Sequence, residues 1–192
     1  MMLLVNIDYA GDIQSLRDRL EARFRTRVNI ALAECDFRAF LDTRRNQYDS
    51  SAIINWLELA FSPFSKPVTA GFKLAGGQVG FLSGEADRVL AVTGVDLYIP
   101  VLTFVFGQAR LNGRCAVVSS FRLDNKFYGL PDNPALLQER LLKEAIHELG
   151  HTFGLLHCHD PECVMKSSTY VEEIDFKSSR FCERCFDKLV EY

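Results

Sequence analysis

The residues best suited to chemistry lie in one short stretch, HELGHTFGLLHCHDPECVM, which runs from His147 to Met165. His147 and His151 are four residues apart, and on a helix this spacing places both imidazoles on one face. Two nitrogens so placed can reach one zinc ion at about 2.0–2.1 Å. Glu148 directly follows the first histidine, so its carboxylate can lie beside the ion without binding it and act as a general base.

A third histidine follows the expected end of this helix. Gly154 can end the helix in the left-handed conformation, after which the chain reverses and returns His157 to the same ion. Three histidines leave one coordination position open for water, as in catalytic zinc sites. A chance HExxH on a polar helix is the competing interpretation, but HExxHxxGxxH is a much more specific pattern. We interpret the fourth histidine, His159, as a surface residue, with an additional ligand as the alternative.

Four of the six cysteines lie close to the histidines in the sequence. Two close pairs separated by a longer loop are typical of a tetrahedral thiolate zinc site, which is closed and stabilises the fold. The four are Cys158, Cys163, Cys182 and Cys185. Two disulfides or a redox CxxC are the alternatives, and both are less favoured in a reducing compartment without thioredoxin-like context. Cys35 and Cys115 lie in apolar surroundings and are interpreted as ordinary buried thiols.

The composition indicates a folded domain rather than a protein that binds nucleic acid through its charge. The 192 residues are 48% hydrophobic and 11% aromatic, enough for a substantial core, and the net charge is −3. The most basic segment, Arg17 to Arg27, is interrupted by acids, whereas nucleic-acid binding needs a basic stripe. The N-terminus lacks a signal-peptide pattern, and no apolar run is long enough for a membrane span. We therefore expect a cytoplasmic protein.

The first third of the chain predicts a strand–helix–strand unit followed by a second helix. The first unit suggests two parallel strands joined by a helical crossover. Its expected elements are a strand at Leu3–Asp8, an amphipathic helix at Asp12–Phe24 and a strand at Val28–Ala33. The second helix is expected to begin at a serine cap, Ser50 or Ser51, and to end near Ser62-Pro63.

The middle of the chain predicts a loop, further strands and a long helix. The glycine-rich stretch Gly71–Gly84 has no phosphate-binding pattern and is predicted to be a loop, and Arg88–Ile99 to be one strand or two short ones. Two strand-like runs flank Asn112-Gly113, which predicts a hairpin with positive φ at both turn residues. One of its strands can be an edge that holds an extended peptide, or the hairpin can simply complete the sheet. Asn133-Pro134 predicts the start of a helix that runs to about Phe153.

The chain resembles the archaemetzincins, a branch of the metzincin zinc peptidases, over Glu144 to Cys185. The family pattern is HExxHxxGxxHC, four residues, CxM, a spacer and CxxC. It is met by His147, Glu148, His151, Gly154, His157, Cys158, Cys163, Met165, Cys182 and Cys185. The earlier part of the chain resembles the family less specifically, through its length and the order VDLY, FVFG and the NG hairpin.

The resemblance implies an α/β (α+β) fold of the metzincin type. Such a fold has a mixed, mostly parallel twisted sheet with an antiparallel edge strand lining the cleft, a long active-site helix below it, and a small C-terminal subdomain. We expect one catalytic domain over residues 1–192, with an N-terminal subdomain (1–154) and a zinc-stabilised C-terminal subdomain (155–192).

The resemblance also implies two zinc ions per chain. A catalytic ion would be bound by His147, His151 and His157, with Glu148 as the base, and a structural ion by the four cysteines. Met165 would be the Met-turn methionine, an apolar floor under the three histidines. Tyr170 lies in the stretch after it, KSSTYVEEIDF, which departs from the family pattern. A tyrosine that packs in the fold is favoured here over one that reaches the zinc.

These implications favour a zinc-dependent metallopeptidase that hydrolyses peptide bonds. We expect a monomer whose partner is a peptide or protein substrate, and neither nucleic acid nor a membrane. The alternative is a zinc-stabilised binding module whose peptidase site is latent, blocked or inactive.

Overall fold

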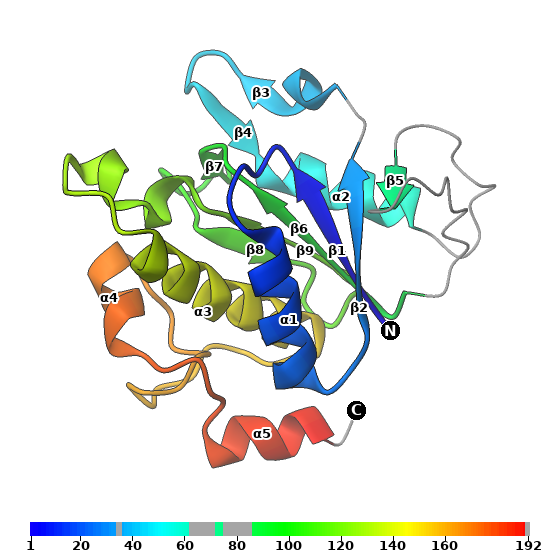
Figure 1. Cartoon of the computed structure of the whole chain (residues 1–192), viewed down its shortest axis with the longest axis vertical. Coiled ribbons are helices and arrows are strands. Elements are labelled where there is room, and N and C mark those ends of the chain that lie inside the picture. The colour runs from blue at the N-terminus through cyan, green and yellow to red at the C-terminus, as the bar shows by residue number, and fades with distance from the viewer. Residues whose placement is uncertain (34–35, 62–71, 75–85, 191–192) are drawn as a thin grey trace.

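A six-stranded sheet forms the centre of the computed structural model, which describes residues 1–33, 36–61, 72–74 and 86–190 (Figure 1). In spatial order its strands are β5 (Phe72–Leu74), β2 (Val28–Ala33), β1 (Met2–Ile7), β6 (Arg88–Thr93), β9 (Cys115–Ser119) and β8 (Gly107–Ala109). The four central strands are parallel, and the outer strands β5 and β8 are antiparallel to their neighbours. The predicted mostly parallel sheet with an antiparallel edge strand is confirmed.

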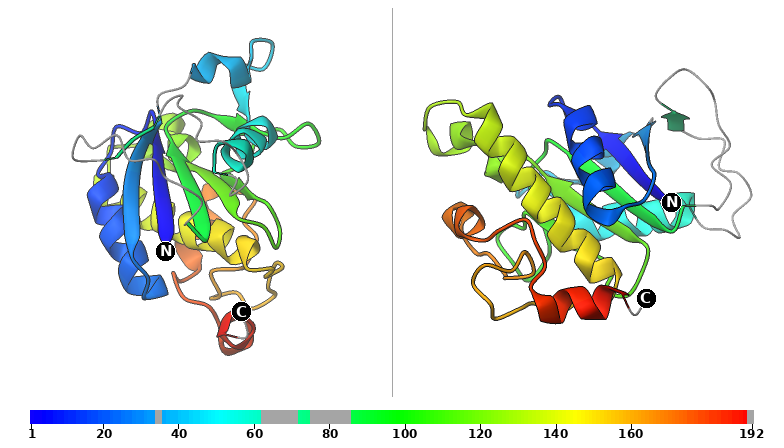
Figure 2. Two further views of the ribbon diagram at one scale, coloured as in Figure 1. Left: turned by 90° about the vertical axis from the view of Figure 1, so that its right-hand side faces the viewer. Right: turned by 60° about the horizontal axis from the view of Figure 1, so that its bottom comes forward.

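Helices cover both faces of this sheet (Figures 1 and 2). Leu4 and Leu90 are paired in register and pack in one core cluster with α1 (Ile13–Phe24) and α3 (Pro134–Thr152). The preceding pair on the same strands, Leu3 and Val89, packs in a second cluster with α2 (Ser50–Ala60). Because successive side chains of a strand point to opposite faces, strands buried on both sides need nearly continuous apolar sequence.

Each predicted N-terminal element is present in the structure, but the start of α2 differs from the prediction. Asp12 caps α1, and its carboxylate accepts a hydrogen bond from the Ser15 N–H at 2.9 Å. The predicted serine cap of α2 is wrong, because the carboxylate of Asp49 accepts from the first N–H groups of that helix. The Ser50 hydroxyl instead lies buried and donates to the Tyr98 carbonyl oxygen at 2.9 Å.

The region between β2 and β9 contains more strands than predicted. Residues 72–74 of the predicted glycine-rich loop form β5, so the prediction is wrong there; the rest of that stretch and Cys35 lie outside the described residues. Such a short edge strand leaves no periodicity to detect. Arg88–Ile99 divides into β6 and β7 (Leu97–Tyr98), the second of the two predicted alternatives. A second, three-stranded sheet joins β7 to β3 (Leu41–Asp42) and β4 (Gln47–Asp49).

The hairpin of β8 and β9 is confirmed, but its turn differs from the prediction. Asn112 has φ 51°, whereas among the described glycines positive φ occurs at Gly129 and Gly154 and not at Gly113. The connection spans residues 110–114 rather than two residues, so Gly113 need not adopt a left-handed conformation. The Asn112 N–H donates to the carbonyl oxygen of His151 at 2.9 Å, which attaches the turn to the end of α3.

The helix α3 carries the first two histidines and has the predicted ends. Asn133 caps it by accepting from the Leu136 N–H at 3.1 Å. Gly154 follows with φ 80°, and its N–H donates to the His151 carbonyl oxygen at 2.9 Å, as expected of a left-handed helix end. Two later helices, α4 (Val171–Phe176) and α5 (Glu183–Val190), were not predicted. Short 3-10 turns occur at residues 37–40, 121–123 and 125–128.

The segment after α3 folds back onto the main core. Leu155, Val164 and Met165 are buried in the same cluster as the inner face of α3. The division into subdomains at residue 154 stays a prediction. Within the described part of the chain, no helix combines the length and the apolar character needed to cross a bilayer.

Candidate metal centres

Three imidazoles converge where α3 ends and the chain reverses. The Nε2 atoms of His147 and His151 lie 3.1 Å apart, and one ring nitrogen from each of these residues and from His157 lies within 4.8 Å of the other two. A tetrahedral zinc ion with bonds of about 2.0–2.1 Å separates its nitrogen ligands by about 3.3 Å. The geometry of the cluster therefore fits one such ion.

Backbone carbonyl groups orient two of these rings. The Nδ1–H of His147 donates to the Val164 carbonyl oxygen at 2.8 Å, and that of His151 to the Leu155 carbonyl oxygen at 2.7 Å. A carbonyl oxygen can only accept, so Nε2 of each neutral ring is left with a lone pair for a metal. Burial lowers the pKa of both imidazoles, most strongly that of His147, so they stay in the neutral, metal-binding form.

Glu148 points from the same helix toward the edge strand β8. A methyl group on Gly107 would lie 2.7 Å from both Cγ and Oε1 of Glu148, and 2.8 Å from the backbone oxygen of Val117. A glycine is therefore needed where β8 passes the carboxylate. Burial raises the pKa of Glu148 well above its ordinary value, and the nearby Glu144 adds to this effect while Lys177 opposes it. Perturbed carboxyl groups of this kind are common at functional sites.

A cavity of about 530 Å³ opens over these groups. Residues 102–109, which lead into and include β8, form one wall, and the three histidines together with Glu144 and Glu148 of α3 form the floor. Ser167, Ser168 and Thr169 line it from the segment after the histidines. Among the strands that the structure describes, β8 is the last of its sheet, so its outer edge is paired with none of them.

Met165 packs against α3 below this turn. It is fully buried, and a methyl group on Gly150 would meet the end of its side chain and lie 3.2 Å from the ring of Phe181. A side chain at this position would therefore have to displace the end of the methionine side chain. The contact agrees with an apolar support for the histidines, although the role of Met165 as such a floor stays a prediction.

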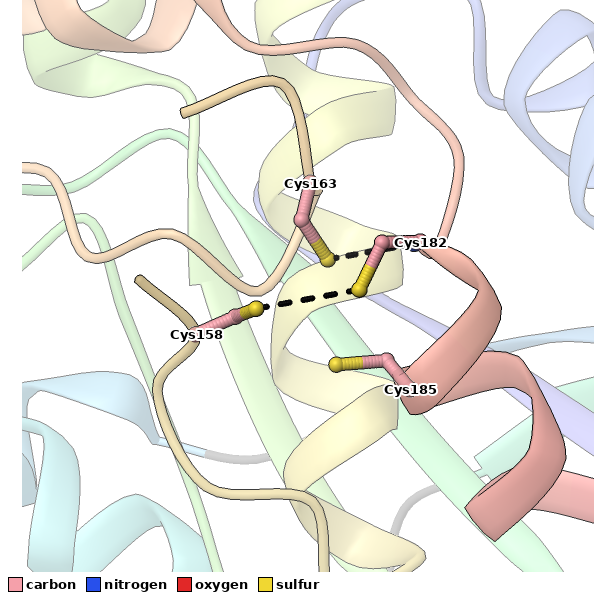
Figure 3. Close-up of side chains that lie close together, drawn as sticks. All are labelled: Cys158, Cys163, Cys182 and Cys185. Carbon is pink, nitrogen blue, oxygen red and sulfur yellow. Dashed lines mark hydrogen bonds between the residues drawn. The ribbon is translucent and has the colours of Figure 1, made fainter. Parts of the chain in front are cut away.

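Four cysteine side chains meet beside the histidine cluster, with their sulfur atoms facing one another (Figure 3). The Sγ atoms of Cys158 and Cys182 lie 3.7 Å apart, and the Cys182 N–H donates to Cys163 Sγ at 3.3 Å. All four thiols are free, with Cys185 completing the group. A tetrahedral zinc ion with Zn–S bonds of about 2.3 Å separates its sulfurs by about 3.8 Å, whereas a disulfide needs about 2.05 Å. The cluster thus fits a metal better than disulfides.

The two clusters share backbone. His157 and Cys158 are consecutive, and the Cys158 N–H donates to the Met165 carbonyl oxygen at 2.9 Å. Cys163 also directly precedes Val164, whose carbonyl group orients His147. The cysteine cluster is therefore linked through adjacent backbone to His147 and His157.

The remaining predicted residues lie outside both clusters. His159 is exposed, as predicted, and it is absent from the metal-ligating groups found among the described residues. The prediction that Tyr170 packs in the fold is wrong, because its side chain is 66% exposed at the start of α4. Cys115 is buried as predicted, and burial raises the pKa of its thiol to about 12.

Several residues that shape the site were not found from the sequence. Gly107 and Gly150 are needed only because distant segments approach them. The carbonyl group of Val164 is a backbone feature that no side-chain pattern reveals. Lys177 and Glu144 form a buried ion pair with Nζ and Oε1 2.8 Å apart. In the sequence, only their positions relative to the histidines could have indicated that they belong to the site.

Comparisons with known proteins identify a family to which the chain is similar. Residues 84–191 match the model of peptidase family M54. Over 108 residues the chain is 55% identical to an archaemetzincin of Methanopyrus kandleri, an alignment that covers 56% of this chain and 58% of that protein. The chain thus matches little more than half the length of such curated relatives.

Solved structures extend the similarity to nearly the whole chain. The crystal structure of the Methanopyrus kandleri archaemetzincin matches with a TM-score of 0.75 and 37% identity, covering 99% of this chain and 93% of that one. A zinc-dependent peptidase from Methanocorpusculum labreanum matches with a TM-score of 0.79 and 30% identity, covering 98% of this chain and 100% of that one.

Proposed function

The chain belongs to peptidase family M54, and from this premise we propose that it is a zinc-dependent metallopeptidase that hydrolyses peptide bonds. One observation carries the proposal: three metal-ligating nitrogens and the carboxylate of Glu148 face one open cavity beside the free edge of β8. A purely structural metal site is closed and has no need of a substrate-sized cavity or an adjacent base.

We assign two zinc ions to the chain. His147, His151 and His157 would hold the catalytic ion, and Cys158, Cys163, Cys182 and Cys185 the structural one. The separations of 3.1 Å between two imidazole nitrogens and 3.7 Å between two sulfurs support both assignments. When bound at the histidines, zinc supplies Lewis acidity, which polarises a carbonyl group and lowers the pKa of water.

Glu148 would act as the general base and then as the general acid. Its carboxylate accepts a proton from the attacking water and then donates it to the amine that leaves, so that the residue returns to its starting state. A raised pKa suits both roles, because the group must accept a proton and release it within one cycle.

The substrate would bind as an extended peptide along β8. Backbone N–H and C=O groups at a free sheet edge can pair with an added strand regardless of its side chains. The apolar side chains of Leu102, Leu111 and Leu156 line the same cavity and are largely exposed, so they can contact apolar substrate residues. We also propose that the protein is a cytoplasmic monomer that needs neither nucleic acid nor a membrane.

The proposal is tested by screening a broad peptide library with zinc-loaded protein and identifying products by mass spectrometry. Wild type should cleave, and Glu148→Ala should lose activity by about 10²–10⁴-fold while its zinc content stays the same. Glu139→Ala is the matched control, because Glu139 lies on the same helix and pairs with Arg19 outside the cavity. If fully zinc-loaded wild type leaves the library intact, the alternative of a zinc-stabilised binding module is favoured instead.

A further inference from the structure

Lys177 places its ammonium group inside the protein, beside the candidate active site. Its side chain is 1% exposed, and Nζ lies 2.8 Å from Oε1 of Glu144 and 3.0 Å from the carbonyl oxygen of Lys166. An ammonium group is costly to bury unless such partners replace water. We propose that Lys177 is a positioning residue that holds the metal-binding histidines in place. The inference rests on the proposed function, because it assigns a role within that site.

The segment Cys163–Lys166, here called the support segment, explains how Lys177 can act at a distance. Cys163 belongs to the thiolate cluster, and the Val164 carbonyl oxygen accepts from His147 Nδ1 at 2.8 Å. The Met165 carbonyl oxygen accepts from the Cys158 N–H at 2.9 Å, next to His157. The Lys166 carbonyl oxygen accepts from Lys177. Four consecutive residues thus connect the histidines to two anchors, the thiolate cluster at one end and Lys177 at the other.

Glu144 joins the second anchor to the helix that carries the histidines. It lies on α3 one turn before Glu148, is 5% exposed, and lines the cavity floor. Its carboxylate holds Lys177 to α3, and Lys177 in turn holds the support segment. His147 on α3 and Val164 in the support segment are therefore connected in two ways. One connection is their own hydrogen bond, and the other runs through the Lys177–Glu144 pair.

Attachment of α4 to α3 does not by itself require this pair. Arg140 makes a bidentate ion pair with Asp175, with both N–O distances 2.7 Å. Lys143 Nζ donates to the carbonyl oxygens of Ile174 and Asp175 at 2.9 and 3.1 Å. Lys143 is thus a matched control: a lysine that joins the same two helices through backbone carbonyl groups, but without contact to the support segment.

The test compares cobalt binding at the histidines by titration, monitored by visible absorption, in protein whose thiolates keep zinc. Lys177→Met alone leaves Glu144 buried without its partner and can fail to fold, so the main variant is Lys177→Met with Glu144→Gln, which removes both charges and keeps the side-chain volumes. We expect cobalt affinity to fall about tenfold, at the lower end of the range for residues behind metal ligands. The Nδ1 proton resonance of metal-free His147 should also shift. Lys143→Met should change neither.

Each outcome decides between distinct conclusions. Retention of wild-type cobalt affinity and of the His147 resonance in the folded double variant would overturn the positioning role and leave the peptidase proposal intact. An equal loss in Lys143→Met would also overturn it, because the effect would then arise from the attachment of α4. If the wild-type histidines bind no cobalt at all, both this inference and the proposed function fail.

Discussion

Replacing Gly107 by alanine should remove most activity while both metal sites stay filled. Its added methyl group would lie 2.7 Å from Cγ and Oε1 of Glu148, and 2.8 Å from the Val117 backbone oxygen. Ordinary carbon contacts are about 3.5–4.0 Å, so the overlap is about 1 Å. The backbone oxygen of Val117 belongs to the neighbouring strand of the sheet and moves little, so Glu148 is the group that must give way.

A displacement of that size has a calculable effect on catalysis. A catalytic group misplaced by about 1 Å can slow a reaction by about 10²-fold. Crowding of a packed interior costs about 1–3 kcal/mol in the free energy of unfolding. None of the three atoms nearest to the added methyl group belongs to a candidate metal ligand, so zinc content is expected to stay at the wild-type level.

The assay is kcat on a peptide that wild type cleaves, measured together with zinc content and thermal unfolding. Gly129→Ala is the control, because a methyl group at Gly129 meets nothing within 4 Å. Since φ is +70° there, alanine should lower the free energy of unfolding by about 1–3 kcal/mol through backbone strain alone. Rate loss should appear in Gly107→Ala and not in Gly129→Ala. A fully metal-loaded Gly107→Ala with wild-type kcat would refute the assigned position of Glu148.

Three further predictions concern core packing, the reactivity of a buried thiol and the structural ion. Gly150→Ala should lower the free energy of unfolding by about 1–3 kcal/mol, because its methyl group would overlap Met165; an unchanged denaturant midpoint would contradict that contact. At pH 8 the Cys115 thiol should react with iodoacetamide about a thousandfold more slowly than an ordinary cysteine, because burial raises its pKa from 9.0 to about 12 and so depletes the thiolate. Mass spectrometry of the alkylated protein measures the rate of labelling. Rapid labelling of Cys115 in the folded protein would contradict the prediction. Cys163→Ser should release the thiolate zinc and lower the melting temperature, and a variant that keeps its zinc and its melting temperature would argue against a structural ion there.

The metal clusters could be predicted from the sequence because their geometry is local. The spacing of His147 and His151 on one helix, and a glycine able to end that helix, are sufficient to bring three rings together. The cysteine pairs follow the same logic, since their spacing matches a tetrahedral site. The central strands were also predictable, because burial on both faces leaves long apolar runs.

Features that depend on contacts between distant segments were not predictable in this way. The need for glycine at position 107 arises where β8 passes Glu148, a residue 41 positions later in the chain. Asp49, Ser50 and Ser51 can all cap a helix, and Asp49 does so because the Ser50 hydroxyl is engaged with Tyr98. Lys177 is a single lysine among many until the fold places it against Glu144.

The central claim is that three imidazoles bind one divalent ion with the Glu148 carboxylate beside it. Anomalous diffraction at the zinc edge, from crystals grown with excess zinc, tests this most directly. We expect two peaks per chain, one bonded to His147, His151 and His157 and one among the four sulfurs. A single peak at the sulfurs, with the imidazoles turned away from one another, would contradict the claim.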